Sequence, residues 1–153
     1  MLHGNSLIDE ASKIQVNNSY ENEQRVLSLV AYLHDEGASA TSLSIERAIK
    51  NNNISLANYL FENFTYDISN RFASELLYNN VSKIYKMNTN VKEDDNIDFN
   101  KEYTTRHIQM ISYLLKYDID LDYNSGGENL SIVEMLEKIN YTELLELLEG
   151  YNN

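Results

Sequence analysis

Acidic side chains alternate along one short stretch of the sequence, at Asp118, Asp120 and Asp122. Oxygen ligands at every second position are typical of the opening of a calcium-binding loop. Such a loop also needs a glycine at its sixth position and a bidentate glutamate at its twelfth. Those positions hold Tyr123 and Asn129 here, so the match to a calcium loop is incomplete and we expect no metal.

Apolar residues fill the places between these acids. Ile119 and Leu121 alternate with the aspartates, a pattern typical of an extended segment with one apolar and one charged side. Besides the calcium loop, two interpretations follow: an acidic finger that binds a partner, or a strand whose carboxylates are merely solvated.

Tyrosines lie beside acidic residues at two places in the chain. Tyrosine is enriched at interface hot spots because it buries a large area with few rotatable bonds. Acidic and aromatic side chains together form a surface suited to lysine and arginine groups. The predicted partner-binding residues are Tyr66, Asp67, Tyr117, Asp118, Asp120, Asp122, Tyr123, Glu128 and Glu134.

No other pattern in the sequence predicts a reaction centre. His3, His34 and His107 are isolated from one another and lack the spacing of a metal site. No serine lies in a G-x-S-x-G context, and Gly126-Gly127 is followed by an acid that would repel phosphate. We therefore expect no catalytic residue, no cofactor and no enzyme activity.

The charge of the chain is strongly negative. Twenty-four acids against twelve bases give a net charge of −12. From residue 117 onward there are nine acids and one base, Lys138, which leaves −8. Such a field repels nucleic acid and anionic membranes and speeds encounter with basic proteins, so we expect a basic protein partner. The alternative is that the charge serves solubility alone.

Composition favours a single compact helical domain over residues 1–153. Apolar residues make up 42% of the chain, enough for a core, and the absence of proline with only five glycines favours helices. There is no cysteine, no apolar run of about 18 residues and no apolar signal segment at the start. These absences predict a cytoplasmic protein without a membrane anchor.

The stretch at 43–68 predicts the elements that organise the chain. Ile45, Ala48 and Ile49 share one face of a short helix. Three asparagines at 51–53 then predict a tight turn, because asparagine caps helices and tolerates positive φ. A second helical stripe follows before an extended hook, with Ile54, Leu56, Ala57, Leu60 and Phe61.

Similar periodicity predicts further helices on both sides. In residues 5–16 the inward positions should be Leu7, Ile8, Ala11 and Ile14. In the helix from residue 23 to Gly37 they should be Val26, Leu29, Val30 and Leu33. Two asparagines predict a break inside the helix at 71–87. The acidic, non-periodic stretch 88–102 predicts an exposed loop. The break is expected at Asn79-Asn80, and helices are again expected at 103–117, 130–139 and 141–149.

Three segments of the chain align with one another. Residues 27–39, 55–67 and 109–121 each carry apolar residues ahead of a Tyr-Leu pair, followed by polar residues, and residues 143–151 form a looser copy. The pattern resembles the ankyrin repeat, whose V-x-x-L-L-x-x-G-A-D signature is echoed best at 30–39 and 110–120. The family's T-P-L-H motif is absent, and the intervals between copies are 27, 54 and 33 residues.

This resemblance, over about residues 25–150, implies stacked helix–turn–helix repeats in a solenoid with short extended fingers; another stack of α-hairpins is the alternative. It also implies protein binding. With the negative charge, it predicts an acidic inhibitor of the immunity-protein type that occludes a basic partner such as a toxin. The second hypothesis is a microbial or viral ankyrin-type effector that recruits a host protein through hydrophobic anchors.

Overall fold

The computed structural model describes residues 6–89, 97–124 and 130–151 of the chain. Across those ranges it contains eight α-helices and no strand, which confirms the predicted all-helical class. The chain divides into two compact units, Met1–Ile68 and Ser69–Asn153, which we call unit 1 and unit 2 and describe separately. A repeat solenoid stays a prediction.

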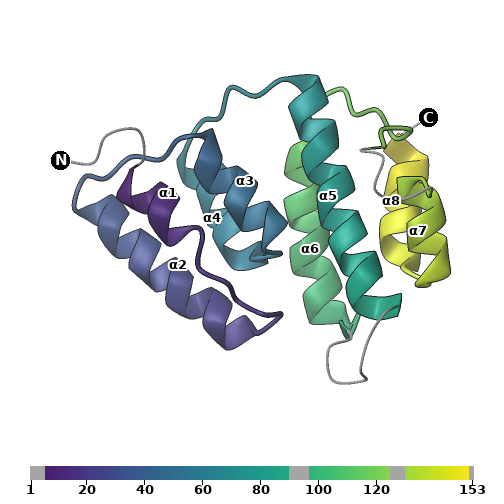
Figure 1. Ribbon diagram of the computed structural model, residues 1–153, viewed down its shortest axis with the longest axis horizontal. Helices are drawn as coiled ribbons and strands as arrows, with labels where there is room; N and C mark the ends of the chain where they lie inside the picture. The colour runs from purple at the N-terminus through teal and green to yellow at the C-terminus, as the bar shows by residue number, and fades with distance from the viewer. Residues whose placement is uncertain (1–5, 90–96, 125–129, 152–153) are drawn as a thin grey trace. The chain divides into compact units, whose positions relative to one another are not determined.

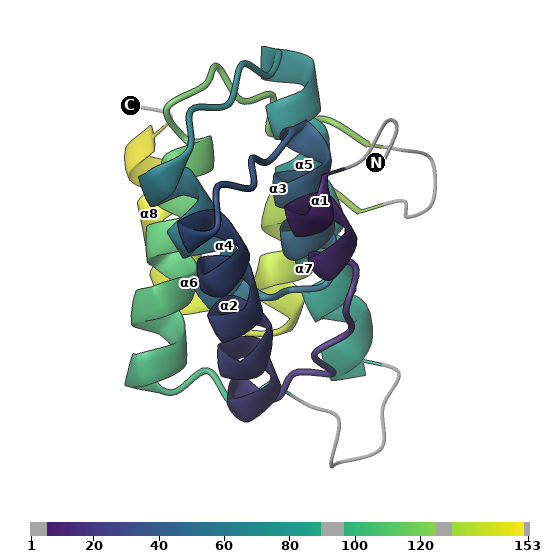
Figure 2. The ribbon, with the colours of Figure 1, turned by 90° about the vertical axis from the view of Figure 1, so that its left-hand side faces the viewer.

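Unit 1 consists of four helices: α1 (Leu7–Ala11), α2 (Tyr20–Asp35), α3 (Ser42–Lys50) and α4 (Ile54–Asn63). Helix α4 packs against both α2 and α3, while the short α1 packs against α2 and α3 (Figures 1 and 2). Helices α1, α3 and α4, with 5, 9 and 10 residues, are too short to be stable alone in water, so they are held by the shared apolar interior of unit 1. Its fully buried residues include Ile8, Val30, Ile45, Ile49, Ile54 and Leu60.

The α3–α4 hairpin forms as the three asparagines predict. Asn51 caps the end of α3, and Asn52 adopts a φ of 53°, which places it in the left-handed region. The side chain of Asn53 then accepts a hydrogen bond from the Leu56 N–H, 3.1 Å away, and caps the start of α4. Each asparagine thus performs a separate local task in the turn.

Three apolar residues predicted to face inward are exposed instead. Helix α1 ends at Ala11, so Ile14 lies in the following turn, and Leu7 lies on its outer side. The inward face of α2 is set by Glu23, Val26 and Val30, and it leaves Leu29 outside. Val26 and Val30 are buried as predicted, and the prediction for Leu29 was wrong because the actual inward face includes a buried glutamate that an apolar pattern does not count.

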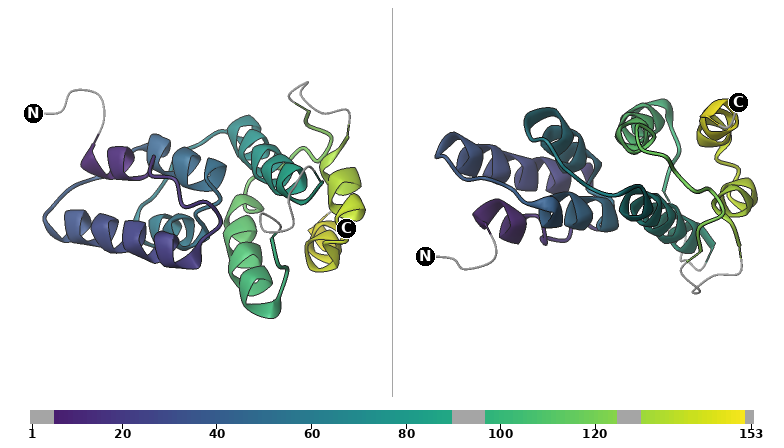
Figure 3. Two further views of the ribbon diagram at one scale, coloured as in Figure 1. Left: turned by 60° about the horizontal axis from the view of Figure 1, so that its bottom comes forward. Right: turned by 90° about the horizontal axis from the view of Figure 1, so that it is seen from above.

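Unit 2 also contains four helices: α5 (Asn70–Thr89), α6 (Lys101–Leu114), α7 (Ile132–Lys138) and α8 (Thr142–Tyr151). Helix α5 packs against α6 and α7, and α8 packs against α6 and α7 (Figure 3). The fully buried residues of unit 2 include Leu76, Leu77, Ile84, Met110, Leu136 and Leu144.

Helix α5 continues through Asn79 and Asn80, so the predicted break between them was wrong. It reaches Thr89 and α6 begins at Lys101, so both ends of the predicted loop at 88–102 are helical. Residues 97–100 carry no helix, and the Ile97 N–H donates to the Asn88 side chain at 3.1 Å. Residues 90–96 lie outside the described part of the chain.

None of the helices in the described ranges combines the length and the apolarity needed to cross a bilayer.

Candidate functional site

The predicted acidic finger leaves the end of α6 and runs along α5 without helical structure. Two side chains of α5 accept hydrogen bonds from its backbone. The Asp118 N–H donates to Asn70 Oδ1 at 3.1 Å, and the Asp120 N–H donates to Ser74 Oγ at 2.9 Å. Asn70 and Ser74 are one helical turn apart, and this spacing is close to the distance between every second residue of an extended chain. The two side chains can therefore bond the N–H groups of Asp118 and Asp120. We call residues 117–124 the acidic segment.

The last residue of α8 holds the same segment from another helix. The Tyr151 hydroxyl donates to the Tyr117 carbonyl at 2.7 Å and accepts from the Ile119 N–H at 2.9 Å. Consecutive N–H groups of the segment at 118, 119 and 120 therefore donate to side chains of α5 and α8. The backbone of the segment is fixed by side chains rather than by a neighbouring strand.

Exposed and buried side chains alternate along the acidic segment. Ile119 is buried and Leu121 half-buried, whereas Asp118, Asp120 and Asp122 are exposed. Within the described residues no ion pair involves these three aspartates.

Two local contacts involve the residues around these carboxylates. Lys116, the nearest basic residue in sequence, lies over the ring of Tyr113 at 4.9 Å. The Asp120 carboxylate also accepts the Asp122 N–H at 2.9 Å, which turns the chain. The segment therefore displays three carboxylates on a backbone held by Asn70, Ser74 and Tyr151.

The tyrosines of the segment are partly engaged by the helices. The ring of Tyr123 meets that of Tyr78, in α5, edge to face at 5.7 Å between centroids. The Tyr78 hydroxyl also donates to Asn124 Oδ1, at 3.4 Å. Tyr117 and Tyr123 are both half-buried, so each leaves part of its ring beside the carboxylates.

The other predicted binding residues lie in other parts of the chain. Tyr66 and Asp67 belong to unit 1, where the Tyr66 hydroxyl lies 2.8 Å from Ser44 Oγ. Burial raises the pKa of Tyr66 to about 12. Asp67 is exposed. Glu134 caps α7, since its carboxylate accepts the Ser131 N–H at 3.1 Å, and Glu128 lies outside the described residues.

Unit 2 also contains a buried polar cluster that the sequence analysis missed. His107 is fully buried; its Nε2 lies 2.7 Å from Asn80 Oδ1 and its Nδ1 lies 2.8 Å from the Tyr141 hydroxyl. The amide oxygen can only accept, so Nε2 carries the hydrogen and Nδ1 accepts from the tyrosine. The rings of Tyr103 and Tyr141 both stack on the imidazole, at 5.4 and 5.6 Å.

This cluster holds its histidine in the neutral form. Burial, and then the nearby Arg106 charge, lower the pKa of His107 to about 3. Burial likewise raises the pKa of Tyr141. With both ring nitrogens bonded and no surface exposed, His107 is placed to hold α5, α6 and the start of α8 together rather than to meet a substrate. Its position one turn before the buried Ile111 was the available signal.

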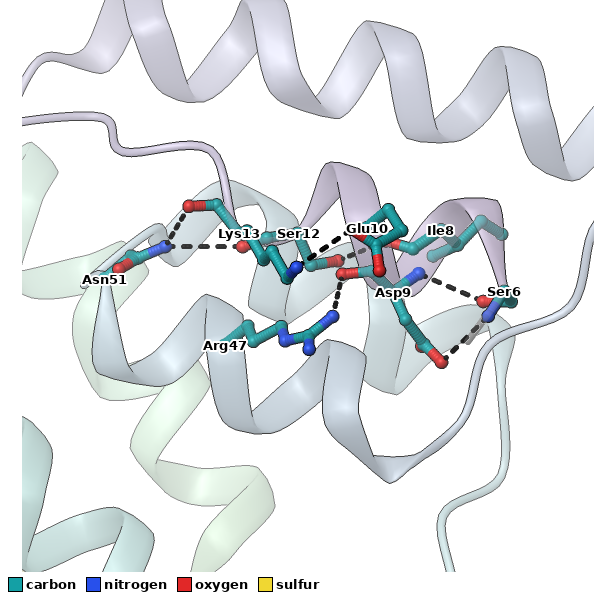
Figure 4. A network of polar contacts seen from close by, with 8 residues as sticks. All are labelled: Ser6, Ile8, Asp9, Glu10, Ser12, Lys13, Arg47 and Asn51. Carbon is teal, nitrogen blue, oxygen red and sulfur yellow. Dashed lines mark hydrogen bonds and ion pairs between the residues drawn. The ribbon is translucent and has the colours of Figure 1, made fainter. Parts of the chain in front are cut away.

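Unit 1 has a polar cluster of its own, centred on Asp9 (Figure 4). The buried Asp9 carboxylate accepts from the Thr41 N–H at 3.0 Å and the Thr41 hydroxyl at 2.6 Å. Arg47 donates to the Asp9 carbonyl at 2.6 Å, and Asn51 donates to the carbonyls of Ser12 and Lys13 at 3.3 and 3.2 Å. The bonds from Arg47 and Asn51 satisfy backbone carbonyls at and just after the end of the short α1, so the cluster is structural.

The described residues contain no group of three or more histidines, cysteines or acids arranged to hold a metal ion. No protein-family model, curated protein or solved structure matches this chain. The resemblance to the ankyrin repeat therefore remains a prediction from the sequence.

Proposed function

We propose that this chain is a protein-binding module that docks a basic protein on its acidic segment and occludes it, as an immunity-type inhibitor does. The observation that supports the proposal is the contrast within residues 117–124. Three backbone N–H groups there are fixed by α5 and α8, while three aspartates are exposed. A surface that is already ordered loses little conformational freedom on binding.

Charge supports the same choice of partner. The net charge of −12 attracts a basic protein over a distance of about 10 Å at 0.1 M salt. At the surface, the aspartates would take the place of phosphates in a cationic cleft. Binding of this kind has a fast association rate that falls as salt is added. The half-buried Tyr117 and Tyr123 supply apolar area beside the charges.

The test compares two sets of neutralised carboxylates in unit 2. The first variant is Asp118→Asn, Asp120→Asn, Asp122→Asn, which keeps an amide oxygen where Asp120 accepts a hydrogen bond. The matched control is Glu143→Gln, Glu146→Gln, Glu149→Gln on the exposed side of α8, which removes the same charge. Both are used with the unchanged protein to capture partners from the native source at low and high salt.

We expect the unchanged protein and the α8 control to recover one strongly basic protein at low salt. The aspartate variant should lose it, and its association rate with the purified partner should fall about tenfold or more. Equal recovery by the aspartate variant would contradict the proposal. Recovery that survives high salt would instead support recruitment through hydrophobic anchors.

A further inference from the structure

The outer side of α2, together with its C-cap residue Glu36, carries four exposed side chains in one line: Arg25, Leu29, Tyr32 and Glu36. Their intervals of four, three and four residues are those of the contact positions in a coiled coil. Leu29 is 41% exposed and Tyr32 is 61% exposed. The Glu36 N–H still donates to the Tyr32 carbonyl, at 3.1 Å, so Glu36 continues the helical turn. We call these four residues the α2 stripe.

The stripe is complementary to itself when two copies lie antiparallel. A two-fold axis midway between Leu29 and Tyr32 places Leu29 of one copy opposite Tyr32 of the other. The same axis places Arg25 of each copy opposite Glu36 of the other, which gives two ion pairs at the ends of an apolar centre. A parallel arrangement would set each charge against its own kind. Identical patches related in this way form the usual interface of a homodimer.

We propose that the α2 stripe is a homodimer interface, in which two copies of this chain pair their α2 helices antiparallel. Arg25 already pairs with Glu21 at 2.7 Å, but these side chains are 70% and 75% exposed. Such a pair contributes little and leaves the guanidinium able to reach a second carboxylate. A balanced stripe of one base and one acid favours a second copy over the basic partner of the acidic segment.

The size of the stripe sets the strength of the dimer. Two apolar side chains and one charge pair at each end, over about three helical turns, form a small interface of the weak, reversible kind. The dimer should therefore form with a Kd in the micromolar to millimolar range and exchange rapidly.

The experiment uses charge exchange between the two ends of the stripe. Sedimentation velocity is measured over rising concentrations, to about 1 mM, for the unchanged protein, Arg25→Glu, Glu36→Arg and the variant carrying both changes. Each single variant opposes like charges at both ends, so its self-association should weaken about tenfold or more. The double variant should dimerise as the unchanged protein does. The two single variants mixed in equal amounts should also dimerise, since their charges then match.

Two further variants distinguish association through the α2 stripe from non-specific hydrophobic association. Leu29→Lys should abolish the dimer, whereas Leu7→Glu, which changes another exposed leucine of unit 1, should leave it intact. Circular dichroism checks that every variant is helical, and recovery in the mixture shows that both single variants are folded. An unchanged protein that stays monomeric to about 1 mM would overturn the proposal. So would a mixture that fails to recover, or a Leu7→Glu variant that dissociates like Leu29→Lys.

Discussion

The two units bury polar groups between short helices in chemically different ways. Unit 1 buries carboxylates: Asp9 accepts from Thr41, and Glu23 Oε1 accepts from the Ser55 N–H at 2.9 Å and its hydroxyl at 3.0 Å. Unit 2 buries neutral groups instead, in the cluster of His107, Asn80 and Tyr141.

This difference bears on where each unit shows its charge. In unit 1 acidic side chains serve the interior and the ends of helices. In unit 2 the interior is held by neutral hydrogen bonds and stacked rings, and the aspartates of the acidic segment are exposed. Hydroxyl and amide side chains, at Tyr151, Ser74 and Asn70, fix the backbone of that segment. Because these side chains are uncharged, they do not neutralise the aspartates of the acidic segment, whose charge can then interact with a partner.

The largest expected effect comes from His107→Ala. The change removes a fully buried ring that contacts the rings of Tyr103 and Tyr141. It also removes the hydrogen bonds that the imidazole makes with Asn80 and Tyr141. The free energy of unfolding should fall by about 3–5 kcal/mol in a denaturant titration. The control is His34→Ala in unit 1, where a half-buried histidine meets Tyr59 at 2.7 Å and a loss of about 1 kcal/mol is expected. Equal losses in the two variants would remove the contrast between the units.

The second effect is a pH dependence that His107 gives to unit 2. Its pKa is about 3 in the folded chain and 6.5 in the unfolded chain, so only the unfolded chain takes up the proton between these values. The stabilisation is complete above pH 6.5 and is lost as the pH falls toward 3. His107→Gln should reduce the slope of unfolding free energy against pH in this window by at most about 1.4 kcal/mol per pH unit. Identical slopes in the two proteins would contradict the buried neutral histidine.

The third effect tests the buried carboxylate of unit 1. Asp9→Asn places an amide where Thr41 donates from both its N–H and its hydroxyl, so one donor loses its acceptor. The free energy of unfolding should fall by about 1–3 kcal/mol in thermal or denaturant melts. Glu21→Gln, in α2, weakens the highly exposed pair with Arg25 and should cost under about 1 kcal/mol. If both variants melt alike, the carboxylate of Asp9 has no special role.

The smallest effect concerns the support of the acidic segment. Tyr151→Phe removes the one hydroxyl that bonds both the Tyr117 carbonyl and the Ile119 N–H. The expected loss is about 1 kcal/mol in a denaturant titration. Tyr32→Phe, at an exposed tyrosine of unit 1, should have almost no effect and serves as the matched control. A neutral result for Tyr151→Phe would show that α8 does not hold the segment.

Features set by neighbours in the sequence were predictable. The turn at Asn51, Asn52 and Asn53 follows from what asparagine does at caps and at positive φ, so the α3–α4 hairpin was found. The alternation around Ile119 likewise gave the segment its two sides. These signals act over two to four residues, and no distant contact reverses them.

Features set by distant contacts were not predictable. Asn80 reads as a helix breaker, yet His107, 27 residues away, satisfies its side chain inside the unit. Ser74 and Tyr151 give no sign that they bond the acidic segment, because their partners lie 46 and 32 residues away. An apolar pattern also cannot show that Glu23 faces inward and leaves Leu29 outside. Each miss arose from a polar side chain satisfied by tertiary contact.

Amide hydrogen exchange at Asp118, Ile119 and Asp120, followed by NMR, tests most directly whether the acidic segment is held in place. If α5 and α8 bond these N–H groups, all three should exchange about tenfold or more slowly than in an unfolded chain. Tyr151→Phe should then speed exchange at Ile119 more than at Asp120, whose acceptor is Ser74. Exchange of all three at the unfolded rate in the unchanged protein would contradict the account.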